Sequence, residues 1–96
     1  MALIVQKYGG TSMGSIERIK NVAQRVARGF DEGNEMIVVV SAMSGETNKL
    51  VALGNETCEF PDLREYDVLV AAGEQVSIAL LAMTLIGMGY KAKSYH

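Results

Sequence analysis

The strongest constraint on the fold is the segment Glu35–Val40, in which apolar and mostly β-branched residues follow one another without polar alternation. Strands of this kind are usually covered on both faces, as they are in parallel sheets. A second short apolar and β-prone segment, Ala2–Lys7, is followed by Gly9-Gly10 and predicts another buried strand. Parallel strands must be joined by a crossover connection, which is usually a helix.

The residues between these two strands have the spacing of such a helix. Ser15 is the expected N-cap and Gly33 the expected stop, because glycine readily adopts the left-handed conformation after a last turn. The apolar positions lie three and four residues apart and form one helix face: Ile16, Ile19, Val22, Ala23, Val26, Ala27 and Phe30. Strand, helix and strand together predict a right-handed βαβ unit.

The second half of the chain predicts more helix and one further strand. A loop at 41–48 leads into a helix that weakens at Gly54-Asn55, and the stretch 58–62 is expected to be a loop. Helical propensity continues over 64–72, and 74–88 predicts an apolar helix buried on most sides. Tyr90–His96 predicts a third strand, so the expected class is α/β with a parallel sheet.

Composition excludes several kinds of protein. A net charge of −2 does not favour nucleic acid, and the lone Cys58 cannot form an internal disulfide. The apolar stretch Val76–Met88 has 13 residues, fewer than the roughly 20 that span a membrane, and the N-terminus lacks the pattern of a signal peptide. His96 has no companions at metal-ligand spacing, so no protein-held metal is expected. We therefore expect a cytoplasmic protein without a membrane or nucleic-acid partner.

The chain ends at the carboxyl end of its third predicted strand, where ligands bind in open parallel sheets. Three strands are also few against the usual number of about 4–6. These two features predict that residues 1–96 are a portion of a larger domain.

The loop after the first strand combines glycines, hydroxyls and a lysine: Lys7-Tyr8-Gly9-Gly10-Thr11-Ser12. Glycines allow close backbone approach, the following helix N-terminus attracts anions, and Lys7 adds a full positive charge. This arrangement predicts a phosphate cradle. The Walker A pattern and the dinucleotide fingerprint are both absent. A plain Gly-Gly turn with a solvated Lys7 remains an alternative.

A second hydroxyl-rich loop follows the next strand and contains Ser41, Ser44 and Thr47. The carboxyl ends of two parallel neighbours share one sheet edge, so both loops are expected to form one polar ligand site. The alternative is that these residues only cap the next helix. Glu74, in Gly73-Glu74-Gln75, is expected either to cap the apolar helix or to accept a hydrogen bond from a substrate ammonium.

These three motifs, in this order, resemble those of the aspartate kinases of the amino acid kinase family, and the resemblance covers all 96 residues. It implies the N-terminal portion of a parallel-sheet αβα kinase domain, without the rest of that domain or regulatory ACT domains. It also implies Mg²⁺- and ATP-dependent phosphorylation of the side-chain carboxylate of L-aspartate to 4-phospho-L-aspartate, the first step of lysine, threonine and methionine biosynthesis. Such a portion is expected to be inactive alone, and the full-length protein is expected to be a homo-oligomer.

The resemblance assigns roles to individual residues. Lys7 and Ser41 are implied as catalytic. The ATP-phosphate segment is Lys7, Tyr8, Gly9, Gly10, Thr11 and Ser12, and the aspartate-binding positions are Ser41, Thr47 and Glu74. Ala71-Ala72 stands where many relatives carry hydroxyl residues, and Tyr8 replaces Phe. Two alternatives stay open: another amino acid kinase with a different acceptor, and a non-catalytic phosphate-binding module or partner subunit.

Overall fold

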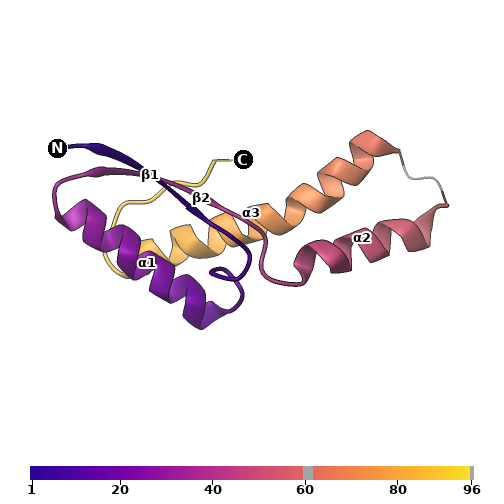
Figure 1. Cartoon of the computed structure of the whole chain (residues 1–96), viewed down its shortest axis with the longest axis horizontal. Coiled ribbons are helices and arrows are strands. Elements are labelled where there is room, and N and C mark those ends of the chain that lie inside the picture. The colour runs from indigo at the N-terminus through magenta and orange to yellow at the C-terminus, as the bar shows by residue number, and fades with distance from the viewer. Residues whose placement is uncertain (60–61, 96) are drawn as a thin grey trace.

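The computed structural model describes residues 1–59 and 62–95 and contains one βαβ unit followed by two helices (Figure 1). The elements, in chain order, are β1 (Leu3–Tyr8), α1 (Ile16–Asp31), β2 (Glu35–Val40), α2 (Glu46–Thr57) and α3 (Leu63–Gly87). Strands β1 and β2 are parallel and pair in register from Leu3 with Glu35 to Tyr8 with Val40. The predicted α/β class and parallel pairing are confirmed. Phe60, Pro61 and His96, which belong to the predicted loop and third strand, lie outside the described residues.

Helix α1 begins and ends as the sequence predicts. The Ser15 side chain accepts a hydrogen bond from the Arg18 N–H at 3.2 Å, which satisfies one of the free donors of the first turn. After the last turn, Gly33 has φ +92°, a conformation that glycine adopts without strain. The buried face of the helix consists of Ile19, Val22, Ala23, Val26 and Ala27.

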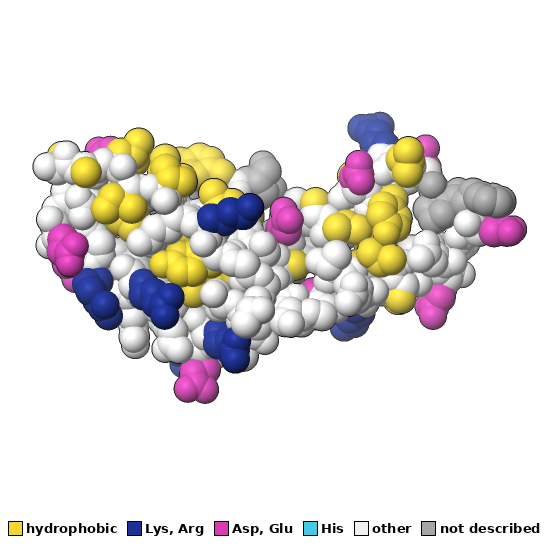
Figure 2. Space-filling model, in the orientation of Figure 1, with side chains coloured by type: hydrophobic (Ala, Val, Ile, Leu, Met, Phe, Trp, Pro, Cys, Tyr) yellow, Lys and Arg dark blue, Asp and Glu magenta, His cyan; other side chains and the backbone are white. Residues whose placement is uncertain are grey.

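Helices α1 and α3 both cover the same face of the sheet. Met36, Val38 and Val40 point into the core that these helices form with β2. On the other face Leu3, Val5, Ile37 and Val39 are 48–63% exposed. The expectation of strands covered on both faces is therefore wrong, because no described element of this chain lies over the second face. Figure 2 shows hydrophobic side chains at the surface of both halves of the molecule.

Helix α3 is one continuous helix of 25 residues, whereas the sequence predicted a shorter helix on each side of Gly73. Its N-cap is Asp62, whose carboxylate accepts from the Glu65 N–H at 3.1 Å. The inner side of the helix is buried at Gly73, Ser77, Leu81 and Leu85. The expectation that its apolar half is buried on most sides is wrong, because Val76, Met83 and Ile86 are 52–66% exposed.

The predicted third strand is absent from the described residues. Tyr90–Tyr95 has no regular structure and pairs with neither strand. It is anchored at its start, where the Tyr90 hydroxyl donates to the Asp31 carboxylate at 2.7 Å and the Tyr90 ring meets Phe30 edge-on at 5.8 Å. The hydrogen bond to Asp31 raises the pKa of Tyr90. A β-prone segment becomes a strand only when it has a partner to bond with.

The molecule is elongated, with extents of 51 × 24 × 19 Å. The sheet, α1 and the C-terminal half of α3 form a body, and α2 with the N-terminal half of α3 forms an arm that projects from it (Figure 1). The base of the arm lies where β2 leads into α2, so the arm is attached beside the carboxyl end of the sheet.

By length and composition alone, α3 is also long and apolar enough to cross a membrane, which the 13-residue stretch Val76–Met88 was not. It is the one helix of this kind in the described part of the chain. Core helices of soluble proteins meet the same criterion, so the finding by itself is weak evidence for a membrane span. The buried inner side of α3 contacts α1 and β2.

The two isoleucines of α1 provide a test of this core. Ile19 is fully buried, whereas Ile16, on the same helix, is 52% exposed. Ile19→Ala should lower the free energy of unfolding by about 2–5 kcal/mol, since it removes buried methyl groups and leaves a cavity. Ile16→Ala should change it by less than about 0.5 kcal/mol. Urea unfolding followed by circular dichroism measures both, and equal effects would contradict the described core.

Candidate functional site

The two predicted loops meet at the carboxyl end of the sheet. The Ser41 N–H donates to the Tyr8 carbonyl at 3.0 Å, which extends the pairing one step beyond the strands. Farther along, the first loop passes so close to the second that a Cβ on Gly10 would lie 3.2 Å from the Ala42 carbonyl oxygen. Only glycine permits this approach without displacement of one loop. The expectation that both loops share one sheet edge is confirmed.

The first loop, Gly9–Ser15, presents unused backbone donors. In the described part of the chain, no acceptor bonds the four successive N–H groups of residues 9–12. The loop curls back at Met13, whose N–H donates to the Gly9 and Gly10 carbonyls at 3.2 Å. Met13 is fully buried, and this anchors the curl in the core. Free backbone donors in front of the 16-residue helix α1 form a site suited to an anion.

Arg18 is a contributor that sequence reasoning missed. Its guanidinium donates to the Thr11 carbonyl at 2.8 Å and so fixes the middle of the first loop to the first turn of α1. Its position three residues after the N-cap was the available signal, because a long side chain there reaches back over the preceding loop.

Lys7 and Tyr8 point to opposite faces of the sheet. Lys7 is exposed on the bare face, one residue before β1 ends, and its side chain makes no ion pair in the described residues. Tyr8 lies on the covered face against the core, and its hydroxyl donates to the Gln6 side chain at 2.8 Å. Lys7 is thus available to a ligand, while Tyr8 contributes its backbone to the site.

The second loop leaves its hydroxyls unoccupied. Helix α2 is capped by Gly45, with φ +85°, and has no side-chain capping hydrogen bond. The alternative that these residues only cap the helix is therefore wrong. Across the described residues, the side chains of Ser41, Ser44 and Thr47 make no hydrogen bond to any protein group. Ser41 is half-buried and Thr47 is exposed in the first turn of α2.

Glu74 lies in the middle of α3, exposed, so the interpretation of Glu74 as a capping residue is wrong. The neighbouring residue, Gly73, lies where α3 packs too closely against other elements for a larger side chain. A Cβ on Gly73 would lie 3.1 Å from the Ala42 Cβ and 3.2 Å from Leu50. The middle of α3 is thus pressed against the second loop and α2, which places Glu74 on the stretch of α3 that passes the second loop, at the junction of the body and the arm.

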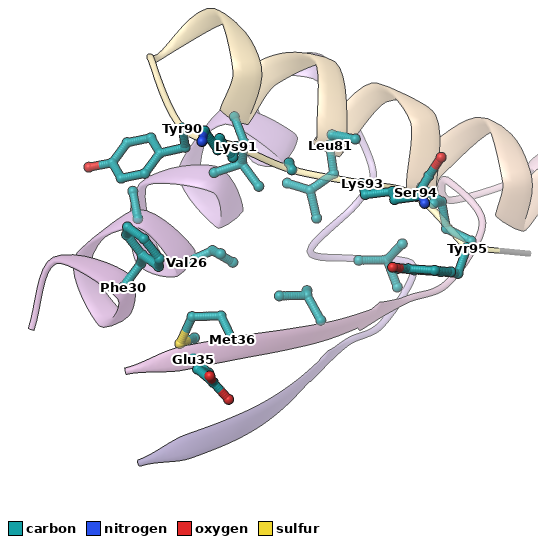
Figure 3. Close-up of a pocket in the computed structure, with 17 residues that line it drawn as sticks. Val26, Phe30, Glu35, Met36, Leu81, Tyr90, Lys91, Lys93, Ser94 and Tyr95 are labelled. Atoms are coloured by element: carbon teal, nitrogen blue, oxygen red, sulfur yellow. The ribbon is translucent and has the colours of Figure 1, made fainter. Parts of the chain in front are cut away.

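One apolar cavity lies away from both loops. It measures about 380 Å³ and separates β2 from the C-terminal half of α3 and the segment Tyr90–Tyr95 (Figure 3). Apolar side chains such as Val26, Met36 and Leu81 dominate its wall, and none of the predicted site residues lines it. The cavity corresponds to the place left open by the unpaired C-terminal segment, and we assign no ligand to it.

The comparisons with known proteins agree with one another. The model of the amino acid kinase family matches residues 2–96. The chain is 58% identical over 95 residues to an aspartokinase of Pseudomonas aeruginosa and 56% identical over 94 residues to an aspartokinase of Geobacillus stearothermophilus. The crystal structure of an aspartate kinase from Synechocystis matches 90% of this chain and 15% of its own chain, with a TM-score of 0.86 and 52% identity.

The similarity covers a minor part of the relatives. The matches include 99% and 98% of this chain, yet the chain spans only about 23% of the length of those two aspartokinases. Most of the sequence of these relatives therefore has no counterpart in these 96 residues.

Gly10 provides a test of the contact between the loops. Gly10→Val should lower the free energy of unfolding by about 1–3 kcal/mol, because its side chain meets the Ala42 carbonyl and forces the loops apart. Gly9→Ala is the matched control, since a Cβ on Gly9 has open space around it. Thermal or urea unfolding compares the two variants. If both proteins were as stable as the parent, the loops would not be in contact.

Proposed function

The chain belongs to the amino acid kinase family, and from this premise we propose that it forms the ATP-phosphate and aspartate-binding loops of an aspartate kinase. The observation that carries the proposal is the meeting of two loops with unused donors at the end of a parallel sheet. The first loop offers four free backbone N–H groups and the second offers three free hydroxyls. The names of the relatives support aspartate as the acceptor.

In the proposed reaction a side-chain carboxylate oxygen of L-aspartate attacks the γ-phosphorus of ATP. A new P–O bond forms, the bond between the γ-phosphorus and the bridging β,γ-oxygen breaks, and ADP leaves with that electron pair. The product is 4-phospho-L-aspartate. A carboxylate is already a nucleophile, so the reaction needs no strong general base; it needs the two anions to be brought together and aligned.

The residues of the first loop meet this need. The amide groups of Gly9, Gly10, Thr11 and Ser12 bind phosphate oxygens, and Lys7 neutralises the charge that accumulates as the phosphoryl group moves. Tyr8 serves through its backbone, which holds the two loops together. Arg18 is a positioning residue, because it fixes the Thr11 carbonyl.

The second loop and α3 supply the acceptor side of the proposed site. Ser41 follows β2 directly and lies closest in sequence to the pairing of the two strands, so we place it beside the transferring phosphoryl group. Thr47 donates to the aspartate, and Glu74 accepts from its ammonium group. Gly73 determines how near Glu74 comes, since it sets the distance of α3 from the second loop.

Mg²⁺ would be held mainly by ATP itself. The described residues contain no group of three or more His, Cys, Asp or Glu side chains that could hold a metal ion. Phosphate oxygens are the ligands that Mg²⁺ prefers, and it commonly binds with few protein ligands. When bound, the ion supplies further neutralisation of phosphate charge.

The proposal includes a reducing, cytoplasmic location, which the exposed and unpaired Cys58 supports. It includes no nucleic-acid partner, in line with the net charge of −2. A non-catalytic phosphate-binding module is the alternative. The chain alone is expected to show no turnover, so the distinction needs a protein that restores the remaining sequence.

A chimera provides this test. In it the 96-residue chain replaces the matching segment of the Pseudomonas aeruginosa aspartokinase, and hydroxylamine traps acyl phosphate formed from ATP, Mg²⁺ and aspartate. The chimera should turn over. Lys7→Ala should lower its kcat by about 10²-fold or more, since it removes a charge that acts on the transition state.

Lys91→Ala is the matched control for Lys7→Ala and should leave kcat unchanged, because Lys91 follows α3 and lies outside both loops. A folded chimera without turnover would favour the non-catalytic module. Equal kcat values for Lys7→Ala and the parent would show that Lys7 is a solvated lysine that does not act in catalysis.

Thr47→Val in the same chimera tests the acceptor side. It should raise KM for aspartate by about 10-fold with little change in KM for ATP, because one hydrogen bond to a charged ligand is lost. Thr57→Val, at the other end of α2, is the control and should leave both KM values unchanged. A change in KM for ATP alone would show that Thr47 does not bind aspartate.

A further inference from the structure

Ala42, in the second loop, lies between the first loop and helix α3. It is buried, with 6% of its surface exposed. A Cβ on Gly10 would lie 3.2 Å from the Ala42 carbonyl oxygen, and a Cβ on Gly73 would lie 3.1 Å from the Ala42 methyl carbon. One residue is therefore packed against both the loop that offers free backbone donors and the helix that carries Glu74.

An alanine at position 42 forms a spacer of fixed length. Its methyl group has no alternative rotamers, so it cannot turn aside when a neighbour approaches. Leu50 also lies near Gly73, with its Cδ1 atom 3.2 Å from the same Cβ position, but a leucine side chain can change rotamer. On the other side, the fully buried Met13 holds the first loop through its bond to the Gly10 carbonyl at 3.2 Å. Ala42 therefore determines how far the first loop lies from the middle of α3.

Both positions that we assign to the acceptor are attached to the α3 end of this spacer. Glu74 is the residue after Gly73 in α3. Thr47 lies in the first turn of α2, where the Cβ of the preceding residue, Glu46, is 3.9 Å from a Cβ on Gly73. A displacement of Gly73 away from Ala42 thus moves Glu74 and changes its distance from the first loop.

We propose that Ala42 is a positioning residue that determines the chain length of the acceptor. This role rests on the proposed function, in which the first loop binds the phosphates of ATP and Glu74 binds the ammonium group of aspartate. The acceptor must then span a fixed distance between the two groups. L-Aspartate has one methylene group between its α-carbon and its side-chain carboxylate, and L-glutamate has two. The spacing that Ala42 imposes is that of the shorter acceptor.

A small change in this spacing has a large effect on the reaction. The attacking oxygen must lie in line with the phosphorus atom, and a misplacement of about 1 Å can slow such a step by about 100-fold. Ordinary carbon contacts are about 3.5–4.0 Å long, so a methyl group on Gly73, at 3.1 Å from Ala42, would displace α3 by up to about 1 Å. The extra methylene group of glutamate lengthens the acceptor by a similar amount, roughly one C–C bond of about 1.5 Å.

Unfolding of the 96-residue chain tests the spacer. Alanine favours a helix over glycine, yet Gly73→Ala should lower the melting temperature by about 5 °C or more, because its methyl group meets that of Ala42. In an Ala42→Gly background this loss should fall to about half or less. Gly54→Ala is the matched control: its Cβ meets Leu69 at 3.1 Å and not Ala42, so Ala42→Gly should not reduce its effect.

The chimera with the Pseudomonas aeruginosa aspartokinase tests the selectivity. The ratio of kcat/KM for L-aspartate to kcat/KM for L-glutamate does not depend on the amount of folded protein, so a merely structural role of Ala42 would not change it. Gly73→Ala should lower this ratio by about 10-fold or more, since a wider spacing disturbs the alignment of aspartate and accommodates the longer acceptor. Ala42→Gly/Gly73→Ala should return the ratio toward that of the parent, and Gly54→Ala should leave it unchanged.

Two outcomes would overturn the role of Ala42 and leave the proposed function intact. One is a Gly73→Ala chain that loses no stability, or that loses the same amount with and without the Ala42 methyl group. The other is a chimera that turns over aspartate and keeps the ratio of the parent in Gly73→Ala. A folded parent chimera without turnover would instead contradict the proposed function, and with it the role of Ala42 as an acceptor spacer.

Discussion

The parallel pairing of β1 with β2 is the constraint on which the rest of the structure depends. Parallel strands end at the same edge, so whatever follows each strand must emerge side by side. The hydrogen bond from Ser41 to the Tyr8 carbonyl carries this pairing into the loops, and glycine at position 10 lets them close on each other. The two loops therefore lie side by side at this edge without further support.

Local sequence was sufficient to predict the βαβ unit. The helix limits at Ser15 and Gly33, the parallel pairing and the shared loop edge all follow from spacing and capping within one contiguous stretch. The features that could not be predicted depend on residues far apart in the chain. Gly73 is an example: as a glycine between two helical segments it indicated a boundary, whereas its role is to let Ala42 and Leu50 approach a continuous helix. That approach is invisible to any local pattern.

Burial was the least predictable property. The composition of Glu35–Val40 is that of a strand whose two faces are both covered by other elements. In the described chain, only one face of this strand is covered. The same holds for Tyr90–Tyr95, which has strand-like composition and no partner. The composition of a segment indicates the surroundings in which it is stable, such as a sheet covered on both faces. The described residues of this chain provide only part of those surroundings. The apolar side chains that no described element covers are therefore exposed, as they are at Leu3, Val5, Ile37 and Val39.

Helix α3 connects the candidate site to this exposed surface. Its inner side meets the second loop at Gly73, and its outer side carries exposed apolar residues such as Val76, Met83 and Ile86. Gly73 and Val76 lie within one turn of a single continuous helix, so the contact that sets the distance between α3 and the second loop also sets the position of the outer side. Because the helix is continuous, a substitution that displaces Gly73 from Ala42 would move Glu74 and the exposed outer residues together.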